Sequence, residues 1–100
     1  MGATNFIEFG KGKTAAEAFN RLVEEAKTEY SYSLYNGTIS TTTLIPGSIR
    51  VADKWSDDVR EEALKVANLD RYGKKWESRA IDCGRCDGGR MWAFYGWAAF

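Results

Sequence analysis

The feature that most constrains this 100-residue chain is its C-terminal stretch, residues 89–99, which is apolar on both faces. Alternate side chains of an extended strand point to opposite faces. One face would carry Met91, Ala93, Tyr95, Trp97 and Ala99, and the other would carry Trp92, Phe94, Gly96, Ala98 and, just beyond, Phe100. This pattern is typical of a strand that is covered on both sides. The rest of the fold must therefore provide that cover.

Two amphipathic helices are available for this purpose. Residues 15–30 repeat apolar side chains at three- and four-residue spacing, and Thr14 with Glu17 forms a capping box at the helix start. A second helix is predicted from Ser56 or Asp57 to Asn68, with an acidic first turn that suits the helix dipole.

The remaining segments predict strands. Residues 4–9, 48–52 and 75–82 are strand candidates, as is 89–99, and turn residues punctuate the region between the helices. There, Asn36-Gly37 predicts a β-hairpin within residues 30–45, and Pro46-Gly47 predicts a type II turn. The order β-α-β-β-α-β-β predicts a single α+β domain over residues 1–100.

We expect a two-layer sandwich in which both helices pack on one face of a mostly antiparallel sheet. The other face, or the free edge of the last strand, would then be left for loops, for a partner, or for a second copy in a homodimer.

The charge balance restricts the classes of partner. Lys and Arg number 14, as do Asp and Glu, so no global field would attract nucleic acid or an anionic membrane. No stretch has the ~20 apolar residues of a membrane helix, and the N-terminus lacks a signal-peptide pattern. We expect a cytoplasmic protein that binds neither a membrane nor nucleic acid directly.

The absence of histidine restricts the chemistry. It removes Ser-His-Asp and Cys-His catalysis and histidine metal ligands. Gly12-Lys13-Thr14 matches only the end of a Walker loop, because Ile7 stands where that motif needs glycine. We therefore expect no enzymatic activity and no cofactor.

Cys83 and Cys86 have the spacing of a redox pair or of half a zinc site. Zinc needs four ligands, so a second copy, or Asp82 and Asp87, would have to complete the set. Asp87-Gly88-Gly89 instead favours a hairpin tip, so no metal is assigned. Redox and metal roles stay open as alternatives.

Short segments spread over most of the chain resemble a group of small, largely uncharacterised proteins of phages and prophages. They are Asn5-Phe6, residues 12–14 leading to Ala18-Phe19, residues 35–39, Lys75-Trp76 and residues 94–98. The resemblance implies an accessory protein that acts by binding, for example by blocking a host enzyme or a CRISPR effector complex.

The sequence and the resemblance together predict a non-enzymatic phage protein that binds and inhibits a host protein in the host cytoplasm, as an anti-CRISPR does. The expected contact residues are Arg85, Arg90, Trp92, Tyr95 and Trp97. One alternative is a binder of small ligands or signalling nucleotides, with Tyr30, Tyr32 or Tyr35 stacking on bases and Lys11, Lys13 or Arg85 holding phosphate. Another is a thiol redox or metal-binding protein that uses Cys83 and Cys86.

Overall fold

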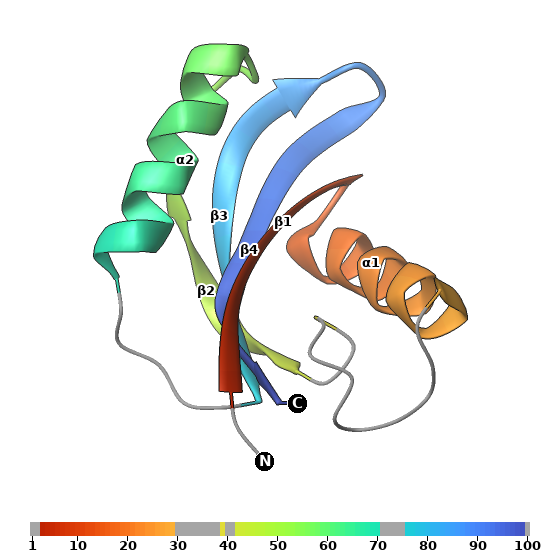
Figure 1. Ribbon diagram of the computed structural model, residues 1–100. Coiled ribbons are helices and arrows are strands. Elements are labelled where there is room, and N and C mark those ends of the chain that lie inside the picture. Colours follow the sequence, from red (N-terminus) through yellow and green to blue (C-terminus); the bar gives the residue numbers. More distant parts are fainter. Residues whose placement is uncertain (1–2, 30–38, 40–41, 71–75, 100) are drawn as a thin grey trace.

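A computed structural model describes residues 3–29, 39, 42–70 and 76–99 (Figure 1). The helices and strands in these ranges are β1 (Ala3–Gly12), α1 (Ala15–Glu29), β2 (Thr43–Arg50), α2 (Asp57–Leu69), β3 (Glu77–Cys86) and β4 (Gly89–Ala99). The hairpin predicted at Asn36-Gly37 lies outside the described residues. No helix in these ranges is long and apolar enough to cross a membrane.

The C-terminal strand is an interior strand of the sheet. The strand order is β1-β4-β3-β2, with β4 antiparallel to both of its neighbours and β2 parallel to β3. The chain returns from β2 to β3 through α2, as a parallel connection requires. Because β4 is paired on both sides, its expected free edge does not exist. A homodimer through that edge is therefore a wrong expectation, and the outer strands are β1 and β2.

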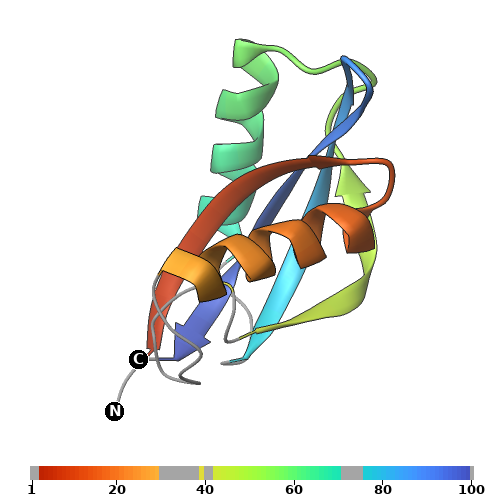
Figure 2. The ribbon, with the colours of Figure 1, turned by 90° about the vertical axis from the view of Figure 1, so that its right-hand side faces the viewer.

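The two helices lie on opposite faces of the sheet (Figures 1 and 2). On one face, Phe19 of α1 packs with Trp92 and Phe94 of β4. On the other, Ala63 of α2 packs with Ala93 and Tyr95. The predicted α+β class, with a mostly antiparallel sheet packed by amphipathic helices, is confirmed. One helix covers each face of the sheet, whereas we expected both helices on the same face. This arrangement explains why β4 is apolar on both of its faces.

Both helix starts form as the sequence predicts. The backbone N–H of Glu17 donates to the Thr14 hydroxyl at 3.1 Å, and the Glu17 carboxylate accepts from the N–H of Lys13 at 2.8 Å. Ser56 caps α2, where its hydroxyl accepts from the N–H of Val59 at 3.3 Å. The lysine-rich segment before α1 is therefore a helix cap in this fold.

Pro46-Gly47 does not form the predicted turn. The strand β2 runs through both residues, and its register against β3 shifts between Leu44 and Ser48. Gly47 has a φ of +94°. An edge strand tolerates proline, whose missing N–H costs no ladder hydrogen bond when it faces outward. The two residues therefore form an irregularity within β2.

The segment that follows β2 stays beside β3. The N–H of Val51 donates to Asp82 O, the N–H of Arg85 to Asp53 O, and the N–H of Trp55 to Arg85 O, at 2.9 to 3.0 Å. Gly84 makes this approach possible. A Cβ at Gly84 would collide with the backbone nitrogen of Lys54, and the residue has a φ of +96°.

Two glycine substitutions separate these effects. Gly84→Ala should lower the free energy of unfolding by about 3 kcal/mol, because strain at positive φ adds to a backbone collision. Gly47→Ala has a similar φ but open space around the new methyl group, so it should cost only about 1 kcal/mol. Urea unfolding measures both, and equal losses would contradict the close packing at Gly84.

Candidate functional site

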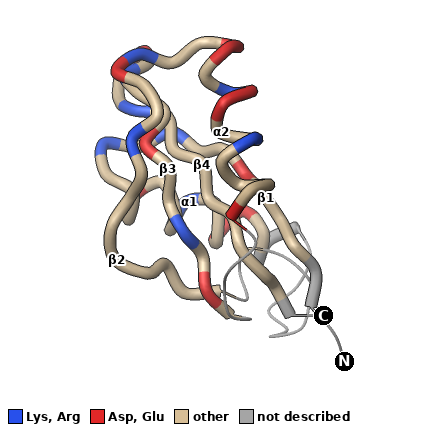
Figure 3. Tube along the Cα trace, turned by 90° about the vertical axis from the view of Figure 1, so that its left-hand side faces the viewer, with Lys and Arg blue, Asp and Glu red and all other residues tan. Residues whose placement is uncertain are grey.

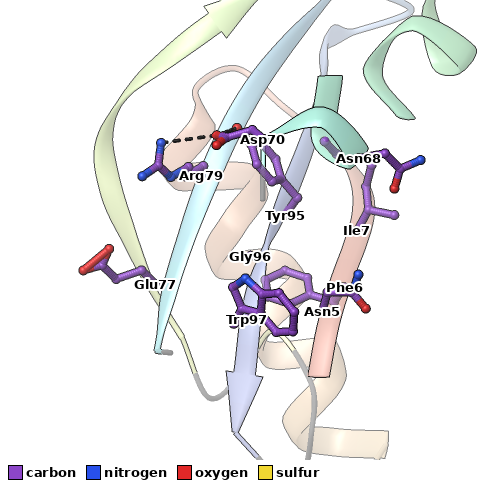
Figure 4. Close-up of a pocket in the computed structure, with 11 residues that line it drawn as sticks. Asn5, Phe6, Ile7, Asn68, Asp70, Glu77, Arg79, Tyr95, Gly96 and Trp97 are labelled. Atoms are coloured by element: carbon purple, nitrogen blue, oxygen red, sulfur yellow. Dashed lines mark hydrogen bonds and ion pairs between the residues drawn. The ribbon is translucent and has the colours of Figure 1, made fainter. Parts of the chain in front are cut away.

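A hollow of about 240 Å³ lies on the α2 face of the sheet, at the C-terminal end of α2 (Figure 4). We call it the α2 hollow. It exists because α2, with 13 residues, spans only about 20 Å, whereas β4, with 11 residues, spans about 37 Å. Its lining comes from β1, β3, β4 and the end of α2: Asn5, Phe6, Ile7, Ala67, Asn68, Asp70, Glu77, Arg79, Tyr95, Gly96 and Trp97.

The sheet forms the floor of the hollow. Asn5 lies opposite Trp97, Ile7 lies opposite Tyr95, and Tyr95 lies opposite Arg79 on its other side. Partners in a ladder share a face, so these side chains gather on one surface. Between Tyr95 and Trp97, Gly96 allows the backbones of β3 and β4 to approach closely. A Cβ at this position would collide with the carbonyl oxygen of Glu77.

A hydrogen-bonded group of three side chains ties the end of α2 to this floor. The Tyr95 hydroxyl donates to Asp70 Oδ2 at 2.7 Å, and Arg79 Nη1 lies 3.3 Å from the same oxygen. Burial raises the pKa of Tyr95 to about 12, and its hydrogen bond to Asp70 acts in the same direction. Tyr95 is therefore a neutral hydrogen-bond donor at physiological pH.

Trp76 adds a strained backbone at the start of β3. Its φ is +81°, a left-handed conformation that is uncommon for a non-glycine residue. Its N–H donates to Trp97 O at 3.1 Å, and its carbonyl accepts from the N–H of Thr43 at 2.7 Å. These bonds join β2, β3 and β4 beside Trp97. Strain of this kind tends to gather at functional sites.

The surface beside the α2 hollow continues towards β2. A second hollow of about 180 Å³ is lined by residues 45–49 and shares Arg79 and Tyr95 with the first. Ile49 is 47% exposed there, and Leu69, between two residues that line the α2 hollow, is 85% exposed. The view from the α2 side shows an uncharged tube along most of β2 (Figure 3).

Two of the expected contact residues belong to the core. Trp92 is 8% exposed, packs on the α1 side, and donates from Nε1 to Gly12 O at 3.1 Å. Tyr95 is 3% exposed and is held by Asp70. Their expected place on an accessible contact surface is therefore corrected, because β4 is covered on both faces. Trp97 is half-buried and lines the α2 hollow.

The two arginines of the hairpin region differ in their surroundings. Arg85 is exposed, near the end of the sheet that lies away from the α2 hollow. Arg90 donates from Nε and Nη2 to the buried carboxylate of Asp82 at 3.0 to 3.1 Å. Arg50 Nε lies 3.4 Å from Asp82 Oδ2, which also accepts from Arg90 Nη2. Arg90 therefore holds β3 and β4 together, and its substitution would also disturb the fold. Only a substitution of Arg85 can test whether the β3–β4 hairpin contacts a partner.

Removing each arginine in turn tests this difference. Arg90→Ala should lower the free energy of unfolding by about 3 kcal/mol, because it leaves the buried Asp82 carboxylate without its main partner. Arg85→Ala, at an exposed position, should change it by less than about 0.5 kcal/mol. Chemical denaturation of both variants gives the comparison. A stable Arg90→Ala protein would show that the pair is dispensable.

The cysteines are in different environments. Cys83 is fully buried in the α2-side core, whereas Cys86 is half-buried, and both are free thiols. The turn itself is at Asp87 and Gly88, after the end of β3, so Cys83 lies within the strand. Burial, with a smaller effect of the Asp82 carboxylate, raises the pKa of the Cys83 thiol to about 11. In the described ranges, no group of three or more His, Cys, Asp or Glu side chains could hold a metal ion.

Thiol labelling tests the redox alternative. Because Cys83 is buried and protonated at neutral pH, Ellman's reagent should titrate only Cys86 rapidly in the native protein. The second thiol should react only after unfolding in guanidinium, and a Cys86→Ser variant should show no fast reaction. Two fast thiols, or a Cys83–Cys86 disulfide under mild oxidation, would restore the redox interpretation.

The cations proposed for a nucleotide, Lys11, Lys13 and Arg85, lie towards the β3–β4 hairpin end of the sheet, where Arg90 is opposite both Gly12 and Arg85, and not at the α2 hollow. Lys11 lies opposite Met91, six residues along β1 from Asn5, which is opposite Trp97. That separation is about 20 Å. Tyr30, Tyr32 and Tyr35 lie outside the described residues. Among the described residues, the α2 hollow is lined by two carboxylates and one guanidinium, which together are a poor setting for phosphate.

No protein-family model, curated protein or solved structure matches this chain. The surface best suited to binding is therefore identified from the chain itself. It consists of the α2 hollow with the exposed Ile49 and Leu69. Of the contact residues expected from the sequence, Tyr95 and Trp97 line this surface. Its other residues gave no motif, because strands that are distant in the sequence bring them together.

Proposed function

We propose that this chain is a non-enzymatic protein of phage or prophage type that binds and inhibits a host protein in the host cytoplasm. A CRISPR effector complex is the target class suggested by the resemblance to small phage proteins. The contact surface of this proposal is the α2 hollow with Ile49 and Leu69. This surface takes the place of the β3–β4 hairpin and of the faces of the C-terminal strand, which the sequence had suggested as the main contact.

The observation that carries the proposal is the exposure of large aliphatic side chains beside a hollow. Leu69 and Ile49 are the exposed large hydrophobic residues of the described part of the chain. A single exposed apolar residue needs no explanation, but these two flank adjoining hollows that share Arg79 and Tyr95. Apolar residues around a pocket are what a protein interface requires at its centre.

The geometry also supplies a place for an anchoring side chain. Interface binding energy is concentrated in a few side chains that fill well-packed pockets. The α2 hollow has a fixed floor, because Tyr95 and Arg79 are tied to Asp70. A partner that docks here would meet a preformed pocket and would lose little entropy in ordering it.

Two surface substitutions test this proposal. The double variant Ile49→Thr/Leu69→Asp should capture about tenfold less of the target than wild type, because both positions would lose apolar contact area. The measurement is a pull-down from a lysate of a CRISPR-bearing bacterium, quantified by mass spectrometry. It is followed by a DNA-cleavage assay of the captured effector with and without the protein.

The matched control is Arg85→Ala, also at an exposed position but distant from the α2 hollow. It should capture and inhibit like wild type. Both variants should first match the wild type in thermal unfolding. Loss of capture with Arg85→Ala alone would move the contact to the hairpin, and a wild-type eluate without a stoichiometric host protein would refute binding as the function.

A further inference from the structure

We infer that the hairpin end of the sheet binds the phosphate backbone of double-stranded DNA through a row of cations on the α1 face. This ligand goes beyond the proposed function, and its surface lies on the face opposite to the α2 hollow. The neutral charge of the whole chain predicts no direct contact with nucleic acid, but a net charge does not describe how the charges are placed. Three features carry the inference: a local surplus of cations, a pair of opposed arginines, and the width of the row.

The chain segments at this end of the sheet are rich in cations. The ends of β1 and β2 lie at the same end of the sheet as the β3–β4 hairpin (Figures 1 and 2). Residues 11–21, 50–54 and 82–90, all of them described, hold seven Lys or Arg and four Asp or Glu. The residues outside the described ranges include no Asp or Glu, so none of them can supply an acidic side chain against this surplus.

Two arginines lie opposite each other in the hairpin. Arg85 is the ladder partner of Arg90, and the register of β3 shifts between Asp82 and Arg85, where Gly84 has a φ of +96°. Without this shift, Arg85 would point to the other face from Asp82, which is three residues away. Like charges that lie directly opposite each other destabilise a sheet. The irregular strand thus creates an unfavourable pair that a bound anion would stabilise.

The buried carboxylate of Asp82 fixes two of the guanidinium groups. Arg90 donates to it from Nε and Nη2, which leaves Nη1 available, and Arg50 Nε lies 3.4 Å from it. The side chain of Arg50 is 64% exposed and also lies 3.8 Å from the exposed carboxylate of Asp53. Arg85 is exposed and has no ion pair among the described residues. Guanidinium donors held in this way suit the oxygens of a phosphate.

The width of the row favours duplex DNA over a single phosphate group. Arg50 ends β2, Arg85 and Arg90 belong to the hairpin, and Lys13 follows Gly12, the ladder partner of Arg90. Three strand spacings, about 14 Å, separate β2 from β1. The major groove of B-DNA is about 12 Å wide and is bordered by phosphates on both sides. The major groove of duplex RNA is too narrow to match this spacing.

The α1 face at this end offers no stacking surface for unpaired bases. Among the described residues, the aromatic rings there are Phe19, Trp92 and Phe94, and all three are buried. The half-buried Phe9 and Trp55 pack on the α2 side, where the acidic first turn of α2 also lies. Single strands depend on stacking, whereas a duplex is held through its phosphates. We therefore expect binding to duplex DNA without sequence preference.

The experiment titrates the purified protein into a fluorescein-labelled DNA duplex of about 20 base pairs and measures fluorescence anisotropy. We expect saturable binding at low salt. Contact with about three phosphates should make the affinity fall about 40-fold between roughly 50 and 200 mM NaCl, because binding releases counterions from the DNA.

Two double variants remove the same charge from different faces. Lys13→Ala/Arg85→Ala, at exposed positions of the row, should bind at least about tenfold more weakly and lose most of the salt dependence. Arg60→Ala/Lys65→Ala, at exposed positions of α2, should bind within about threefold of wild type, because screening limits the reach of its charges. Thermal unfolding establishes that both variants are folded.

The inference is overturned if no saturable binding occurs at low salt, if both double variants weaken binding equally, or if single-stranded DNA or duplex RNA binds more tightly. Its failure is distinguishable from failure of the proposed function. Lys13→Ala/Arg85→Ala should still capture the host protein from a nuclease-treated lysate, and loss of that capture would make the hairpin a protein contact instead.

Discussion

The burial of β4 on both faces is the constraint on which the rest of the structure depends. Trp92 and Phe94 meet α1, while Ala93 and Tyr95 meet α2. This strand supplies side chains to both cores and is an interior strand of the sheet, with β1 and β3 on either side. The helices must then occupy opposite faces. Internal packing thus explains why the C-terminal stretch is apolar. Because β4 is paired on both sides, this strand has no free edge with which a second copy could pair.

The binding surface follows from a mismatch of lengths on one face. The helix α2 ends before the strands beneath it do, so α2 itself does not cover the face beyond Leu69. The fold closes this end with polar contacts, in which Tyr95 and Arg79 meet Asp70. What remains open is a hollow with Trp97 and Glu77 in its lining and Ile49 beyond it. The proposed function places the partner where internal packing stops.

Local patterns predicted the elements well, and long-range pairing limited the rest. The capping box at Thr14 and Glu17, the helix from Asp57 and the last strand over 89–99 all follow from short-range chemistry. The placement of the helices did not follow from such chemistry. An amphipathic pattern shows that a helix packs on the sheet, but not on which face of the sheet it packs. The same limit applies to the site, where Asn5, Arg79 and Trp97 meet only through strand register. Pro46-Gly47 was misjudged because turn residues also occur in irregular edge strands.

The most direct test of the central claim is amide hydrogen exchange of the protein, alone and bound to its captured host partner. If the partner docks at the α2 hollow, binding should slow exchange in residues 67–70, 77–79 and 95–97, and leave residues 85–90 unchanged. Protection confined to residues 85–90 would place the contact at the hairpin and contradict the account. The measurement reads the interface without any substitution, so it does not depend on the stability of a variant.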